Sequence, residues 1–100
     1  MEDHDFYEFT RICKKFVESS YTLREAAQLC ENDPIKQEMV KGVIPDFDEL
    51  CRRSEGIMPL VERSYHENRE FIIQEVKELT QKNLEVAQKI RDKLDCLKWN

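Results

Sequence analysis

The chain has 100 residues, of which 37% are charged and 40% hydrophobic, with only two glycines and three prolines. This composition indicates a single domain over residues 1–100, built from long helices with few loops. The formal net charge of −5 argues against a nucleic-acid partner and against binding to an anionic membrane surface, because both need clustered basic residues.

The sequence also lacks the marks of a membrane or secreted protein. No apolar run approaches the roughly 20 residues that cross a bilayer, and MEDHDFYEF lacks the basic start of a secretory signal, so we expect a soluble, cytoplasmic protein. The four cysteines are Cys13, Cys30, Cys51 and Cys96. They form no CxxC pair and have no histidine at ligand spacing, so we expect no metal site. The first three fall at positions that the helical pattern places in the interior.

Residues 4–31 are predicted to form the first helix, because apolar or small residues recur along them in alternating steps of three and four. This seam consists of Phe6, Phe9, Cys13, Phe16, Ser20, Leu23, Ala27 and Cys30. Ile12, Val17 and Ala26 widen the seam to the breadth expected of a helix covered by two neighbours. ENDP at 31–34 then predicts a turn, with Asp33 capping a new helix that begins at Pro34.

A second seam predicts one helix over 34–65, although GVIP at 42–45 and GIMP at 56–59 interrupt the segment. The seam consists of Val40, Val43, Phe47, Leu50, Ser54, Ile57, Val61 and Ser64, flanked by Ile44, Cys51, Met58 and Tyr65. Because the spacing keeps its register through both pairs, we expect a bent but continuous helix. Pro45 and Pro59 then face solvent, where water can satisfy the carbonyls they leave free. The alternative is a pair of turns between three shorter helices.

Residues 67–98 are predicted to form the third helix. Its seam consists of Ile72, Val76, Leu79, Asn83, Val86, Ile90 and Leu97, with Ile73, Thr80, Ala87 and Leu94 alongside. Ser64 and Glu67 have capping-box spacing and Asn68 is a rival cap, while a single helix over 59–98 is the alternative.

Three helices of similar length predict an all-α fold, an antiparallel up-down-up three-helix bundle with coiled-coil-like packing. An extended hairpin that dimerises has comparable support. Asn83 fits both arrangements, since one buried amide can fix the register of packed helices.

The chain shows no pattern that carries catalysis. It has no glycine-rich phosphate loop, no HExxH and no GxSxG, so we expect a non-enzyme without a cofactor. His4 is expected in a terminus and His66 in a turn, both solvated. Surface ion pairs are expected for Asp48 with Arg52, Glu49 with Arg53 and Glu85 with Lys89, while Glu75 and Glu78 are expected to be solvated. Tyr7 and Trp99 are aromatic candidates for a partner surface.

Several stretches resemble the tubulin-binding cofactor A family of small cytosolic three-helix proteins. The resemblance is carried by CKKFVESSYTLREA at 13–26, DPIKQE at 33–38, ELCRRSEGIMP at 49–59 and EVAQKIRDKL at 85–94. The sequence departs from the family pattern in Gly56, where a bulky residue is usual, in the additional Pro45 and in an early first turn.

The resemblance implies a non-enzymatic cofactor that binds β-tubulin after chaperonin release, without nucleotide or metal. The expected partner-binding residues lie on the polar sides of the second helix; they are Asp46, Glu49, Arg52, Arg53, Glu55, Glu62 and Arg63. The alternative function is a helical subunit or adaptor of a larger coiled-coil assembly, such as a tethering or kinetochore-type complex. In both cases we expect a protein partner and a monomer or homodimer.

Overall fold

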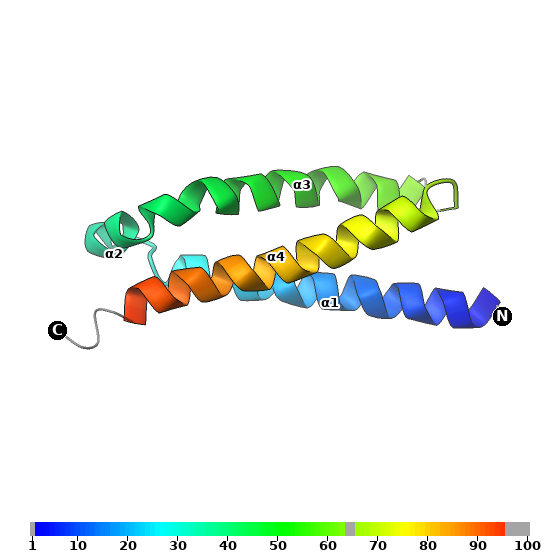
Figure 1. Ribbon diagram of the computed structural model, residues 1–100, viewed down its shortest axis with the longest axis horizontal. Coiled ribbons are helices and arrows are strands. Elements are labelled where there is room, and N and C mark those ends of the chain that lie inside the picture. Colours follow the sequence, from blue (N-terminus) through cyan, green and yellow to red (C-terminus); the bar gives the residue numbers. More distant parts are fainter. Residues whose placement is uncertain (1, 64–65, 96–100) are drawn as a thin grey trace.

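The computed structural model describes residues 2–63 and 66–95, and every regular element within them is helical (Figure 1). The elements are α1 (Glu2–Gln28), α2 (Pro34–Met39), a 3-10 turn η1 (Lys41–Val43), α3 (Ile44–Arg63) and α4 (Arg69–Asp95). The predicted all-α fold is therefore confirmed. The molecule is elongated, with extents of 56 × 21 × 18 Å. None of the described helices is both long and apolar enough to cross a membrane.

The three long helices lie side by side but are not equally close to one another. Figure 1 shows α1 and α4 running in the same direction along the long axis and α3 running in the opposite direction. Helix α4 packs against both α1 and α3. Within the described residues, however, no Cα atom of α3 lies within 8 Å of a Cα atom of α1. Helix α4 is therefore the central helix, with α1 and α3 on either side of it.

The turn after α1 forms as its residues predict. Asn32 has a left-handed backbone with φ of 62°, which a short polar side chain tolerates better than most. The Asp33 carboxylate accepts hydrogen bonds from the backbone N–H groups of Ile35 and Lys36 at 3.1 and 3.2 Å. The predicted cap of α2 and its start at Pro34 are confirmed.

The predicted single helix over 34–65 is wrong at GVIP. Helix α2 ends at Met39, and α3 begins only at Ile44. Pro45 lacks an N–H, and its ring would clash with the carbonyl of Lys41 in a continuous helix. Helix α2 has no buried residue whose packing could offset that cost. The helix therefore breaks, and Pro45 becomes the second residue of α3, where a missing N–H is tolerated.

At GIMP the helix continues as predicted. Pro59 lies inside α3, and both it and Pro45 are exposed, on the side opposite the seam. Ile57 is buried before Pro59, and Leu60 and Val61 pack against the core after it. These contacts on both sides of the proline hold the chain in a helix.

The core is centred on α4. The predicted seam residues of α4 that the structure describes are all buried: Ile72, Val76, Leu79, Asn83, Val86 and Ile90. Helix α3 contributes Leu50 and Ile57, and η1 contributes Val43.

Helix α4 begins directly after Asn68, so a single helix over 59–98 is ruled out. Ser64, Tyr65, Cys96, Leu97 and Trp99 lie outside the described residues.

The predicted seam of α1 is only partly right. The buried residues of α1 are Ile12, Phe16, Ser19, Leu23 and Ala26. Phe6 and Val17 are 67% and 44% exposed, contrary to the prediction, and Phe9 and Ser20 are half-buried. The reason is that, among the described helices, only α4 brings Cα atoms within 8 Å of α1, and one close neighbour covers a narrower stripe than two would.

The two exposed prolines of α3 provide a test of the helix break. We expect Pro59→Ala to raise the free energy of unfolding by about 1–3 kcal/mol, because alanine restores an N–H inside the helix and removes a clash. Pro45→Ala is the matched control and should lower it by up to about 1 kcal/mol, since proline at a helix start restricts the unfolded chain without harming the folded one. Urea denaturation followed by circular dichroism measures both. Changes of the same sign would contradict this assignment.

Candidate functional site

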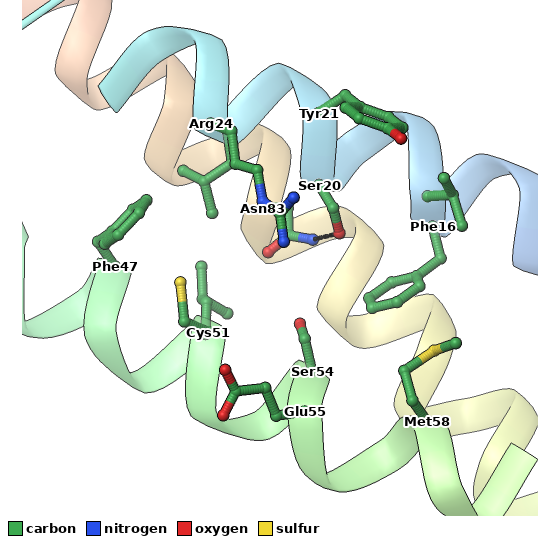
Figure 2. A pocket seen from close by; sticks show the side chains of 13 residues that line it. Phe16, Ser20, Tyr21, Arg24, Phe47, Cys51, Ser54, Glu55, Met58 and Asn83 are labelled. Atoms are coloured by element: carbon green, nitrogen blue, oxygen red, sulfur yellow. Dashed lines mark hydrogen bonds between the residues drawn. The ribbon is translucent and has the colours of Figure 1, made fainter. Parts of the chain in front are cut away.

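A groove runs between α1 and α3, and α4 forms its floor (Figure 2). The central part has a volume of about 280 Å³, and the part next to α2 has about 540 Å³. The two parts share Arg24 and Phe47, so they form one continuous groove. It exists because α4 keeps α1 and α3 apart.

The walls of this groove carry apolar side chains that are accessible to solvent. Val17 and Tyr21 of α1 are 44% and 61% exposed, and Met58 of α3 is 41% exposed. Figure 2 shows Cys51 and Ser54 of α3 facing the wall formed by α1. A cluster of exposed apolar side chains marks an interaction surface, whereas single exposed apolar side chains are common on any protein surface.

The turn region closes one end of the groove. Val40 and Val43 are buried there and contribute to its lining. The Gln37 side-chain amide donates a hydrogen bond of 3.1 Å to the Cys30 carbonyl, which ties α2 to the chain just after α1. The break in the predicted second helix therefore shapes the groove.

Asn83 lies on the floor of the groove and is only 1% exposed. Its Nδ2 donates to Ser19 Oγ at 3.1 Å and to Ser20 Oγ at 3.4 Å. The Ser19 hydroxyl itself donates to the Phe16 carbonyl at 2.6 Å, so its oxygen is free only to accept. Because the Ser19 oxygen can only accept, the Asn83 amide must present its Nδ2 donor to Ser19, and Oδ1 points away from it. Among the described residues, Oδ1 has no hydrogen-bond partner.

The charges beside the groove differ between its walls. Arg24 belongs to the α1 wall and Glu31 to the turn after α1, while Asp48 and Glu55 belong to the α3 wall. Burial raises the pKa of the Cys51 thiol, and the two carboxylates of α3 add to this effect against the opposing influence of Arg24. Cys51 is therefore a protonated, weakly nucleophilic thiol at neutral pH.

Burial also raises the pKa values of the Cys13 and Cys30 thiols. All three described cysteines are free. Cys30 is buried as predicted, while Cys13 and Cys51 are half-buried. Within residues 2–63 and 66–95, no group of three histidine, cysteine or acidic side chains is arranged to hold a metal ion.

Arg53, one of the predicted partner-binding residues, instead joins α3 to α4. Its Nε donates to Glu75 Oε1 at 3.0 Å, and its Nη2 lies 3.6 Å from Glu78 Oε1. The bond to Glu75 raises the pKa of Arg53. A bond from Lys82 at 2.9 Å, together with Arg53, lowers the pKa of Glu78. The expected pair of Arg53 with Glu49 and the expected solvation of Glu75 are therefore wrong, because α4 brings Glu75 within reach of Arg53 and leaves it half-buried. Glu78 is exposed, as expected.

The structure distributes the remaining predicted partner residues over several surfaces. Asp46 and Glu49 lie with Arg53 along the boundary between α3 and α4. Glu49 also pairs with Arg52, which replaces the expected pair of Arg52 with Asp48. Glu55 lines the groove. Arg52, Glu62 and Arg63 are exposed on α3.

The groove itself was not predicted from the sequence, although one signal for it is present. Val17, Cys51 and Met58 flank the seams and make them wider than contact with a single neighbour requires. Because no Cα atom of α1 lies within 8 Å of one of α3 among the described residues, the additional apolar residues remain on the walls of the groove.

Comparison with known proteins identifies no relative: no family model, curated protein or solved structure matches this chain.

The Ser19–Asn83 contact provides a test of the floor geometry. We expect Ser19→Ala to lower the free energy of unfolding by about 1–3 kcal/mol, because Asn83 Nδ2 then loses its shorter buried acceptor. Ser20→Ala is the control and should cost under about 1 kcal/mol, because its contact is longer and half-buried. Chemical denaturation measures both variants. A larger loss for Ser20→Ala would mean that the amide is oriented differently.

Proposed function

We propose that this chain is a non-enzymatic, cytoplasmic protein that binds a helix of another protein, as a subunit or adaptor of a larger helical assembly. The observation that carries this proposal is the separation of α1 from α3 by an apolar groove. In a four-helix bundle each helix packs against two neighbours and faces the fourth across a diagonal. Helix α4 has two neighbours here, and α1 and α3 occupy the positions of two diagonally opposed helices of such a bundle. The fourth position, next to both α1 and α3, is the groove. A partner helix along the groove would pack against both of them.

A site-specific photo-crosslinker tests this proposal. Placed at Met58, in the groove, it should attach to a helical segment of one protein in extracts of the source cells, identified by mass spectrometry of the crosslinked peptide. The matched control is the same group at Arg52, on the same helix but outside the groove lining, and it should give no such product. Equal products at both positions, or none at Met58, would contradict the proposal.

A second candidate is a tubulin-folding cofactor that binds β-tubulin after chaperonin release. It is supported by the resemblance of four stretches to the tubulin-binding cofactor A family and by the charges that α3 presents to solvent. Arg52, Glu62 and Arg63 are exposed, and such charges mainly steer encounter with a large partner.

Mixing with β-tubulin separates the two candidates. If the cofactor candidate is correct, the purified chain should comigrate with β-tubulin on a native gel, and Arg52→Glu with Arg63→Glu should slow association by about tenfold at low salt. If the chain is an assembly subunit, it should not comigrate while a known cofactor does so in parallel. Helicity that increases with protein concentration would further support the assembly candidate.

A further inference from the structure

The Asn83 carboxamide indicates what kind of group the groove accepts. Its Nδ2 is held by Ser19 and Ser20, and its Oδ1 is buried without a donor among the described residues. Buried carbonyl oxygens almost always accept a hydrogen bond. In Figure 2 the Asn83 side chain lies between the walls formed by α1 and α3. A group that enters the groove and carries an N–H or O–H donor could therefore complete this contact.

The shape of the groove favours an elongated occupant. Its lining extends along α3 from Ile44 to Met58, which is about four helical turns, or roughly 21 Å, at 1.5 Å per residue. Along α1 the lining extends from Phe16 to the last turn. An amphipathic helix matches this length and can place apolar side chains against both walls.

The charges beside the groove indicate how that helix would be flanked. Asp48 and Glu55 make the α3 wall acidic, whereas the α1 side carries Arg24 and, in the turn after α1, Glu31. A complementary helix carries basic residues along the flank that faces α3 and an acidic residue opposite Arg24. Such complementarity selects the partner and its orientation more than it adds affinity.

A second copy of the chain fits this groove poorly. Outside the groove, the large apolar side chains that the structure shows as exposed are scattered; they include Phe6 and Tyr7 at the start of α1, Ile35 on α2, and Phe71 and Leu84 on α4. They form no stripe of four turns on one helix. The net charge of −5 also opposes self-association.

From these observations we infer that the groove binds an amphipathic helix of a partner protein that places one hydrogen-bond donor, a side-chain amide or hydroxyl, within its apolar stripe against Asn83 Oδ1. The inference rests on the proposed function and specifies the chemistry of the partner. The donor replaces no hydrogen bond of the folded chain, because Asn83 Nδ2 keeps both serines. Since Oδ1 is buried, the entering helix has to move aside the side chains that cover it.

Two synthetic helical peptides test this inference. Each has about 24 residues, an apolar stripe, lysines on one flank and glutamates on the other, and they differ only in one central stripe residue, asparagine or leucine. Fluorescence anisotropy with the wild-type chain should show about tenfold tighter binding of the asparagine peptide, equivalent to 1.4 kcal/mol at 25 °C. The Asn83→Leu chain has no side-chain carbonyl at this position, so it should bind the leucine peptide more tightly than the asparagine peptide. A peptide with the two charged flanks exchanged should bind more weakly to the wild-type chain.

A second measurement uses the unaltered chain and does not depend on the folding of the variant. Cys51 lines the groove, whereas Cys13 precedes the first lining residue of α1 by almost one turn. Saturating asparagine peptide should slow alkylation of Cys51 severalfold and leave that of Cys13 unchanged, as measured by mass spectrometry.

The outcomes separate this inference from the proposed function. Equal or tighter binding of the leucine peptide to the wild-type chain overturns the inference about the donor but leaves a helix-binding groove. If neither peptide binds and Cys51 stays reactive, both are overturned. If the chain alone forms a dimer in which Cys51 is protected, the occupant is a second copy and the inference is overturned.

Discussion

Ile72, Val76 and Leu79 of α4 are almost fully buried because this helix packs against α1 and α3 at the same time. Fully burying one such aliphatic side chain contributes about 1.5–3 kcal/mol, so the seam of α4 is the main source of stability for a thin bundle. The other long helices depend on it, since within the described residues no Cα atom of α1 lies within 8 Å of a Cα atom of α3. The same constraint produces the groove: the helix that holds α1 and α3 in place also keeps them apart.

The seam of α4 was predictable from the sequence, whereas that of α1 was only partly so. A helix with two neighbours buries its whole apolar stripe, so the spacing identifies the correct residues. In α1, a single close neighbour covers only part of the apolar stripe, and the spacing of the residues alone does not show which part is covered. Ser19 shows this most clearly: it is buried because Asn83, 64 residues away, binds it. No local pattern contains that information.

GVIP and GIMP have similar local chemistry and different outcomes. Each places a proline three residues after a glycine, and local propensity disfavours a helix at both. Pro59 is retained inside α3 because Ile57 before it is buried and Leu60 and Val61 after it pack against the core. Helix α2 has no buried residue that could hold it in one continuous helix with α3 across Pro45. The seven charged residues predicted as a partner site also show that local sequence does not determine how a helix packs on its neighbours. Their exposure on a helix can be read from spacing, but the binding of Arg53 to Glu75 depends on how α3 packs on α4.

The direct packing of α1 on α4 has a consequence for how the chain is made. Helix α1 is synthesised before α4, the helix that covers its apolar face, and α3, which is made between them, has no Cα atom within 8 Å of α1 among the described residues. Contacts between such distant segments close slowly because the intervening chain must lose conformational entropy first. Until α4 has been synthesised, the nascent chain displays the apolar face of α1, and this interval exposes the chain to aggregation.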